Sequence, residues 1–203
     1  CSCNPTNGAK SVLGRVLSST KARPSLLRPM FPSFSASFFF LMTWKTILDD
    51  FVPSRADALA LKKIITTITQ KIKVKDAKVI VGGSGGKNTW LKGTHDVDLY
   101  VKFNYSKFKE KSDQLSTILH KSLKKQFKRV ISLHGSRDYF QIIHSGFTFE
   151  IVPILDIKNY KQARNTTDLS QLHVNFVKKY PKVVNEIRLA KLFAKATNTY
   201  GAE

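Results

Sequence analysis

The chain has 203 residues, of which 42% are hydrophobic, so it can bury a core and wholesale disorder is not expected. Its 34 lysines and arginines against 14 acidic residues give a net charge of +20, which indicates a polyanionic partner; a merely solubilising surface is the plain alternative. The 2 cysteines, Cys1 and Cys3, stand at the very start, so no disulfide framework braces the body, and this favours a reducing compartment such as the cytoplasm.

Residues 1–41 differ in composition from the rest of the chain. They contain no acidic residue and many serines and prolines, and residues 34–42 form an apolar run. That run is far shorter than the ~20 residues that a membrane span requires, so no membrane partner is expected. A basic segment followed by a short apolar run resembles a targeting sequence; the alternative, which we favour, is upstream sequence translated in frame before a native start at Met42. We therefore expect residues 1–41 to be a poorly ordered or non-native segment outside the fold.

The remaining sequence alternates between helical and extended patterns. Apolar residues at helical intervals predict helices in five segments, which are 44–51, 54–72, 112–127, 170–180 and 182–196. Short apolar or alternating runs bounded by turn residues predict strands in five segments, which are 78–81, 96–103, 130–134, 139–144 and 147–152. This order predicts an α+β fold, in which helices back a mixed β-sheet.

The most informative stretch is the glycine-rich turn that follows the first strand. Backbone N–H groups of Gly82 to Gly86, at a strand-to-helix turn, are suited to face phosphates. Asp96 and Asp98 follow on the next strand, where residues i and i+2 point to the same face, so their carboxylates project side by side. Two carboxylates that close repel each other unless a cation lies between them, and oxygen ligands of this kind suit Mg²⁺ or Mn²⁺. The combination predicts a nucleotidyl-transfer site.

Glu150 interrupts the otherwise apolar strand 147–152. One interpretation places it on the solvent side of an edge strand. The interpretation that we favour is burial, because apolar residues flank it on both sides, and a buried glutamate requires a partner such as a metal held by Asp96 and Asp98. Three carboxylates on adjacent strands can hold two Mg²⁺ ions for in-line phosphoryl displacement, with Glu150 nearest the attacking hydroxyl.

These segments together resemble the polymerase-β-like nucleotidyltransferases. The run Gly-Gly-Ser-Gly-Gly-Lys-Asn-Thr-Trp-Leu-Lys-Gly at 82–93, followed by Asp-Val-Asp at 96–98, is similar to the superfamily signature. Within the superfamily the chain most resembles the archaeal-type (class I) CCA-adding enzymes, the tRNA nucleotidyltransferases. Three further segments carry this narrower resemblance, which are 149–153, 167–173 and 186–191 with its continuation to 200–203. The resemblance implies a catalytic head over residues 42–158 and the start of a truncated central neck region over 159–203.

The resemblance also implies a role for each matching residue. Asp96, Asp98 and Glu150, where the family usually has Asp at the third position, would hold two Mg²⁺ ions, with Mn²⁺ as the alternative metal. The residues that would bind the triphosphate and the base of the incoming CTP or ATP are Gly83, Ser84, Lys87, His173, Lys191 and Tyr200. Plain structural alternatives stay open for these residues, namely a helix cap, a solvated surface charge or an ordinary packing side chain.

The implied activity is the addition of CMP and AMP, from CTP and ATP, to the 3′ end of tRNA without a nucleic-acid template. Another polymerase-β-like transferase, such as a poly(A) polymerase or a 2′-5′ oligoadenylate synthetase, is one alternative, and a catalytically silent RNA-binding fragment is another. Members of the family continue past the turn at 200–203 into further domains that grip tRNA, so we expect weak RNA binding and poor fidelity from this chain. The resemblance also leaves open that the protein forms a homodimer, as a possibility for full-length members of the family.

Overall fold

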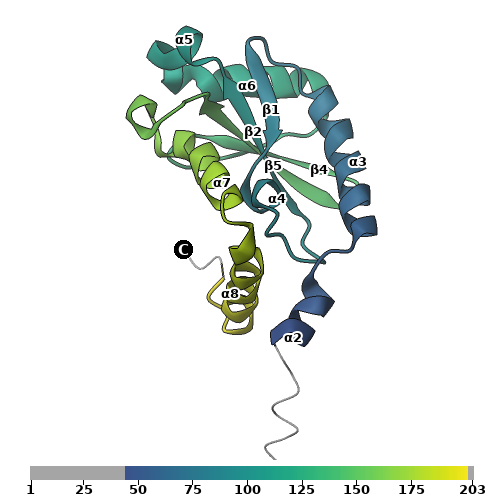
Figure 1. The fold of residues 1–203 in the computed structure, drawn as a ribbon. Helices are drawn as coiled ribbons and strands as arrows, with labels where there is room; N and C mark the ends of the chain where they lie inside the picture. Colours follow the sequence, from purple (N-terminus) through teal and green to yellow (C-terminus); the bar gives the residue numbers. More distant parts are fainter. Residues whose placement is uncertain (1–43, 201–203) are drawn as a thin grey trace, which may run out of the picture.

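The computed structural model describes residues 44–200, so the predictions for residues 1–41 and for 201–203 fall outside the described residues (Figure 1). The helices are α2 (Trp44–Phe51), α3 (Arg55–Lys71), α4 (Gly83–Lys87), α5 (Tyr105–Phe108), α6 (Leu115–Gln126), α7 (Ser170–Lys178) and α8 (Val184–Ala196). The strands are β1 (Ala77–Val81), β2 (Asp96–Phe103), β3 (Ile131–Leu133), β4 (Tyr139–His144) and β5 (Phe147–Leu155). Within the described range, none of the helices combines the length and the apolar character that crossing a membrane requires.

The strands form a single five-stranded sheet in the order β1-β2-β5-β4-β3. β2 and β5 run parallel to each other, and the other neighbouring pairs are antiparallel. The predicted α+β fold with a mixed sheet backed by helices is therefore confirmed.

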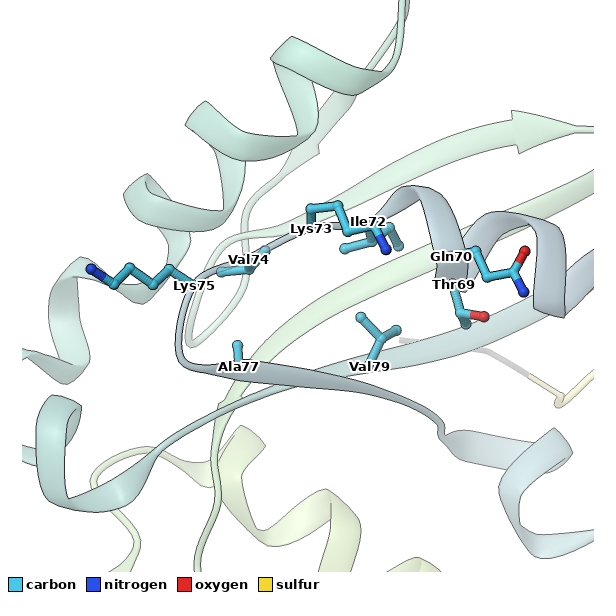
Figure 2. A pocket seen from close by; sticks show the side chains of 8 residues that line it. All are labelled: Thr69, Gln70, Ile72, Lys73, Val74, Lys75, Ala77 and Val79. Carbon is cyan, nitrogen blue, oxygen red and sulfur yellow. The ribbon is translucent and has the colours of Figure 1, made fainter.

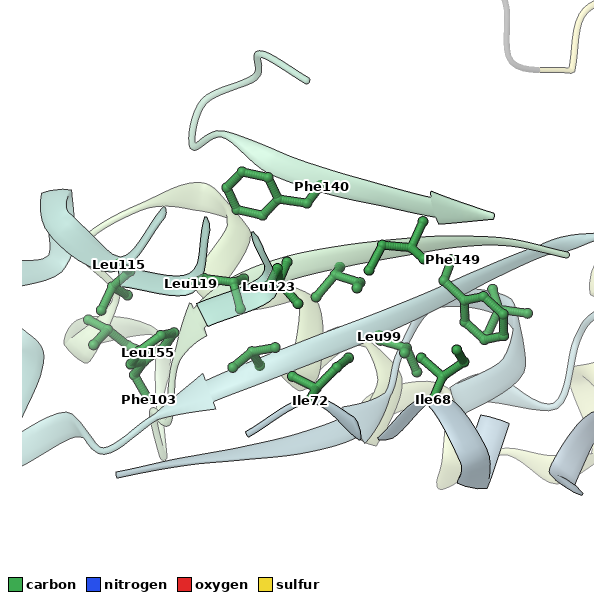
Figure 3. Close-up of a cluster of buried hydrophobic side chains, with 14 of the residues drawn as sticks. Ile68, Ile72, Leu99, Phe103, Leu115, Leu119, Leu123, Phe140, Phe149 and Leu155 are labelled. Atoms are coloured by element: carbon green, nitrogen blue, oxygen red, sulfur yellow. The ribbon is translucent and has the colours of Figure 1, made fainter. Parts of the chain in front are cut away.

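The main core lies between one face of the sheet and the helices α3 and α6 (Figure 3). Leu115, Leu119 and Leu123 recur every four residues along α6, and this spacing places all of them on the helix face that is turned to the sheet. The strands present to them the alternate residues Val97, Leu99, Val101, Phe103, Phe149 and Ile151. Truncating one such side chain to alanine costs about 2–5 kcal/mol, so this packing fixes which face each strand residue occupies.

The opposite face of the sheet carries α4 and α7, and α8 follows α7 and lies next to α2 (Figure 1). A smaller apolar cluster of Tyr100, Ile154 and Val174 joins β2, β5 and α7 there. Because side chains alternate along a strand, the residues between the core positions of β2 and β5 must point to this side. The even-numbered residues of β2 and β5 therefore share one face with the glycine-rich helix α4.

Strand β5 continues to Leu155, past the predicted end at residue 152, although Pro153 has no N–H group to donate. The pairing of β4 with β5 ends at Ile151, so the edge on which Pro153 lacks its donor is not paired with β4. Two residues on, the N–H of Leu155 on the same edge donates to the carboxylate of Asp168 at 2.9 Å. The proline is thus tolerated because β4 does not extend to it, and the side chain of Asp168 takes the place of the strand partner only at Leu155.

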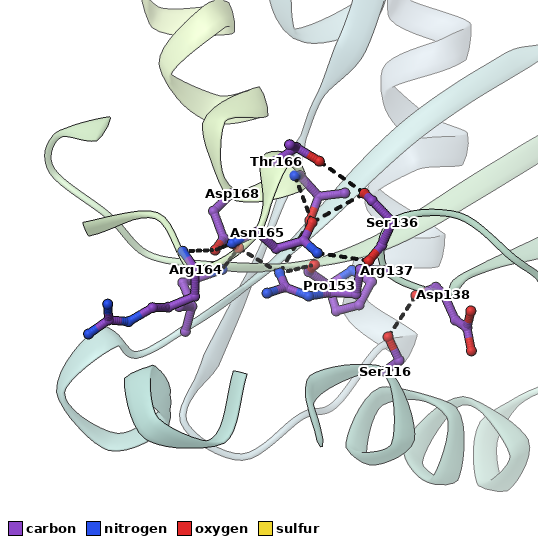
Figure 4. A network of polar contacts seen from close by, with 11 residues as sticks. Ser116, Ser136, Arg137, Asp138, Pro153, Arg164, Asn165, Thr166 and Asp168 are labelled. Carbon is purple, nitrogen blue, oxygen red and sulfur yellow. Dashed lines mark hydrogen bonds and ion pairs between the residues drawn. The ribbon is translucent and has the colours of Figure 1, made fainter. Parts of the chain in front are cut away.

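Asp168 is the centre of a buried polar network (Figure 4). Its carboxylate forms an ion pair with Arg137 at 2.5 Å, and both side chains are almost fully buried. Asp168 also accepts the N–H groups of Arg164 and Asn165 at 3.0 Å, and Arg137 donates to the carbonyl oxygen of Pro153 at 3.1 Å. The network fastens the end of β5 to the turn from which α7 begins. Removing one partner of such a buried pair costs about 3–5 kcal/mol, because it leaves the other charge buried without compensation.

Candidate functional site

Strands β2 and β5 bring three acidic residues to one face of the sheet. Their register places Asp98 directly beside Glu150 and Asp96 beside Thr148. Neighbouring strands are ~4.8 Å apart, and residues two apart on a strand share a face, so Asp96, Asp98 and Glu150 all lie on the side of α4. Asp96 is exposed, whereas Asp98 and Glu150 are half-buried.

The turn after β1 packs directly on Asp98. The N–H of Gly82 donates to the main-chain oxygen of Asp98 at 2.8 Å, and the N–H of Ser84 donates to its carboxylate. Gly83 has a φ of +43°, and a β-carbon at this position would overlap the Asp98 carboxylate. A β-carbon at Gly82 would overlap the ring of Tyr100, whose hydroxyl accepts the N–H of Gly83 at 3.1 Å. Glycine is therefore required at both positions for the turn to approach β2 this closely.

Asp98 carries a negative charge that its surroundings compensate poorly. Burial raises the pKa of its carboxyl above the ordinary value of 3.8, and the charge of Asp96 raises it further. The N–H of Ser84 and the ammonium of Lys87 act in the opposite direction but do not cancel the effect of burial. A cation at this carboxylate would therefore stabilise its ionised form.

Helix α8 is fixed over the loop that joins α4 to β2. Arg188 is 7% exposed and donates from Nη2 to the carbonyl oxygen of Asn88 at 2.9 Å and from Nε to that of Trp90 at 3.3 Å. Three residues further along α8, Lys191 donates from Nζ to the carbonyl oxygen of Thr89 at 3.0 Å. Both side chains therefore lie on one face of α8, and they bind consecutive backbone carbonyls of one loop.

Burial lowers the pKa of the Lys191 ammonium, and the positive charge of Lys87 lowers it further, while Asp98 raises it. Lys87 and Lys191 are thus two like charges facing the same space. An anionic group placed between them would relieve their repulsion. The site combines this anion-attracting pair with a carboxylate that favours a cation.

A cavity of about 320 Å³ opens between the glycine turn, the start of β2 and α8. It is lined by Ser84, Lys87, Trp90, Leu91, Thr94, Asp96, Asp98, Lys191, Lys195 and Tyr200. A hollow between α3 and β1 is larger, at about 600 Å³, but none of the described residues that line it is acidic (Figure 2). Of these two hollows, the one beside Asp98 is where carboxylates and ammonium groups meet, and its volume suits a small-molecule ligand.

The predicted site residues fall into three groups in the structure. Six of them line the cavity, which are Ser84, Lys87, Asp96, Asp98, Lys191 and Tyr200. Gly83 packs against Asp98, and Glu150 lies beside Asp98 in the sheet, but neither lines the cavity. His173 is exposed on α7 and is not among the lining residues, so its predicted contact with a nucleotide stays a prediction.

The three carboxylates fit a divalent cation in their chemistry and in the face that they share. Their side chains, however, are not gathered: among residues 44–200 no three His, Cys, Asp or Glu side chains lie close enough together to form a metal-binding group. The carboxylate of Glu150 instead accepts a hydrogen bond from Nε2 of Gln141 at 2.9 Å, while that of Asp98 is bonded to Ser84. Carboxylates without a cation between them repel one another, and Asp98 and Glu150 each accept a hydrogen bond from another group, so the three-carboxylate metal site stays a prediction.

Sequence reasoning did not assign Trp90, Leu91, Thr94 or Lys195 to the site. A tryptophan in a short polar loop is one signal that could have been used, since an aromatic ring beside phosphate-binding groups is suited to stack on a base. Lys195 follows Lys191 by four residues and so lies on the same face of α8, which is a second signal.

Comparisons with known proteins identify the family of the chain. Residues 61–195 match the family model described as "Nucleotidyltransferase domain", a family that implies the use of a divalent metal. The CCA-adding enzyme of Nanoarchaeum equitans is 39% identical over 167 residues, which cover 80% of this chain and 41% of that enzyme. The CCA-adding enzyme of Pyrococcus horikoshii is 31% identical over 168 residues, which cover 77% of this chain and 36% of that enzyme. The chain thus spans about two fifths of the length of these curated relatives.

Solved structures support the fold. The Cid1 poly(U) polymerase, solved as a mutant bound to MgATP, superposes with a TM-score of 0.57 at 17% identity, covering 76% of this chain and 47% of that one. Since the match at residues 61–195 covers more than half of the sequence, the chain belongs to the nucleotidyltransferase domain family.

Proposed function

We propose that the chain is the catalytic part of a tRNA nucleotidyltransferase that adds CCA to the 3′ end of tRNA from CTP and ATP, without a nucleic-acid template. The observation that carries the proposal is the placement of Asp96, Asp98 and Glu150 on one face beside a glycine turn, next to a cavity with Lys87 and Lys191 on its wall. The similarity to CCA-adding enzymes supports tRNA as the acceptor within this proposal.

In the proposed reaction the cavity binds the incoming nucleotide. The ammonium groups of Lys87 and Lys191 pair with the triphosphate, and the hydroxyl of Ser84 donates a hydrogen bond to it. Trp90 and Tyr200 stand at the cavity wall, where an aromatic face supports the base. His173 is included as a further nucleotide contact on the family resemblance alone.

Asp96, Asp98 and Glu150 would hold the metal, for which we propose two Mg²⁺ ions. When bound, the ions supply charge stabilisation of the triphosphate and lower the pKa of the tRNA 3′-hydroxyl. The 3′ oxygen attacks the α-phosphorus as the bond to pyrophosphate breaks, and the carboxylate of Glu150 accepts the hydroxyl proton. We further propose that residues 42–158 form the catalytic head, that residues 159–203 begin the neck region, and that the protein is located in the cytoplasm.

The test is incorporation of radiolabelled CTP and ATP into a tRNA transcript that lacks its terminal CCA. We expect CMP addition followed by AMP addition, and loss of both in Asp98→Asn. Incorporation of ATP alone would indicate a poly(A) polymerase type of enzyme, and no incorporation of either nucleotide by the wild-type chain would refute the proposal.

A further inference from the structure

The edge of the sheet next to β4 is partly uncovered. β3 is 3 residues long and pairs only with residues 139–141, so β4 extends beyond it. A hollow of about 360 Å³ lies at this edge. Its lining includes six residues that we call the edge surface, which are Lys71, Phe127, Lys128, Arg129, Ile143 and His144.

The edge surface carries positive charge without compensation. Lys71, Lys128 and Arg129 are exposed, and none of the ion pairs found in residues 44–200 involves them. The segments that supply them, 58–75 and 114–137, contain no aspartate or glutamate. A basic hollow of this kind attracts a polyanion.

Apolar groups form part of the same surface. Ile143 is 64% exposed, and Phe127 is half-buried among the basic residues. A single exposed isoleucine needs no explanation by itself. An apolar floor surrounded by cations, however, is the combination that binds a nucleic-acid strand, because phosphates pair with the cations while unpaired bases pack on the apolar side chains.

The edge surface is connected to the carboxylates through Gln141. This residue lines the hollow, pairs with Glu150 in the sheet register and donates from Nε2 to its carboxylate at 2.9 Å. The hollow therefore lies on the β4 side of Glu150, whereas the cavity with Lys191 lies on the β2 side of the site. A strand that passes round this edge of the sheet, from the side of α3 and α6 to the side of α4, would reach Glu150 next to Gln141.

We propose that the edge surface binds the phosphates of the RNA strand whose 3′ end is extended at Glu150. This assignment rests on the proposed function, which supplies RNA as the acceptor. Lys71, Lys128 and Arg129 neutralise phosphates, and Phe127 and Ile143 pack against an unpaired base. A peptide strand pairing with the free edge of β4 is a different occupant, but three uncompensated cations favour phosphate.

The test compares two triple variants of the full chain with the wild-type protein. The first, Lys71→Gln/Lys128→Gln/Arg129→Gln, removes the charge of the edge surface. The control, Lys158→Gln/Lys161→Gln/Arg164→Gln, removes the same charge from exposed residues beyond the C-terminal end of β5. Binding of a fluorescein-labelled tRNA transcript without CCA is followed by anisotropy over a series of salt concentrations. No nucleotide or metal is added, so the result is independent of whether transfer occurs.

We expect the edge variant to bind more weakly and its slope of log K against log salt to be less steep by about 2, at roughly 0.7 per lost phosphate contact. The control should keep the wild-type slope. Equal slopes in the two variants would overturn the assignment, even if the wild-type chain transfers CMP, and so would wild-type affinity in the edge variant. If the wild-type chain transfers no CMP but the two variants show the expected difference in slopes, the proposed function is refuted and the RNA-binding surface is retained. Circular dichroism confirms that both variants are folded.

Discussion

Replacing Arg188 by methionine tests whether the docking of α8 builds the cavity in which we propose that the nucleotide binds. The substitution keeps the aliphatic stem but removes the hydrogen bonds to the carbonyl oxygens of Asn88 and Trp90, at 2.9 and 3.3 Å. A hydrogen bond to a charged group contributes about 1.5–3 kcal/mol. The lower end applies here because these contacts are only partly buried, so the docked position of α8 should lose about 3 kcal/mol.

Two measurements detect this loss. If the whole fold depends on the contact, the melting temperature falls by about 6–12 °C, at ~2–4 °C per kcal/mol for a chain of this size. If only α8 detaches, the melting temperature changes less, but CTP affinity by titration calorimetry falls by up to about a hundredfold, because Lys191 and Tyr200 leave the cavity wall with the helix.

The control for this experiment is Arg55→Met, the same substitution at an exposed position in the first turn of α3. It should alter neither the melting temperature nor the CTP affinity. If Arg188→Met behaves like this control in both measurements, the hydrogen bonds of Arg188 to the loop have no role in forming the cavity and the reasoning is refuted.

Three further variants test the turn, the carboxylate and the buried network. Asp98→Asn should abolish transfer but raise the melting temperature in EDTA at neutral pH, because the ionised carboxyl, whose pKa is raised by burial, destabilises the folded chain. This gain in stability should vanish as the pH falls through the folded-state pKa toward 3.8. A loss of stability at neutral pH would instead indicate a structural role for Asp98. Gly83→Ala should lower the unfolding free energy measured by urea denaturation by about 1–3 kcal/mol, because of its φ of +43° and the overlap of the new β-carbon with Asp98. The loss should be clearly larger than for Gly146→Ala, where φ is +77° but no atom obstructs a β-carbon. Asp168→Asn should lower the unfolding free energy by about 3–5 kcal/mol in the same assay, because it leaves the guanidinium of Arg137 buried without its counter-charge. A loss below about 1 kcal/mol, the value of an exposed ion pair, would contradict this.

The sequence was sufficient to place Asp96 and Asp98 on one face, because strand side chains alternate with a period of two and the apolar partners Val97 and Leu99 mark the buried side. The sequence alone did not determine that Glu150 lies directly beside Asp98 in the sheet. The two strands are separated in the chain by α6, β3 and β4, and a slip of one residue in their register would move Glu150 to the opposite face. That register depends on long-range packing.

The limits of the prediction are clearest at the cavity wall. Ser84 and Lys87 follow from the local glycine motif, but Trp90 and Lys195 become neighbours only when α8 docks on the loop before β2. Arg188, which makes the docking possible, appears in the sequence as one more basic residue on a basic helix. Helical periodicity shows which residues share a face of α8, but it does not show which loop that face meets.

The two perturbed groups at the cavity, Asp98 and Lys191, favour the same kind of ligand for opposite reasons. Burial makes the carboxylate of Asp98 gain from a cation, and burial together with Lys87 makes the ammonium of Lys191 gain from an anion. A metal–nucleoside triphosphate carries both charges in one molecule, whereas free phosphate or a free metal ion satisfies only one of the two groups. Binding of the complex should therefore lower the pKa of Asp98 and raise that of Lys191 together. For the function proposed above, holding these two half-buried charges at one cavity would favour the metal–nucleotide complex over either ion alone.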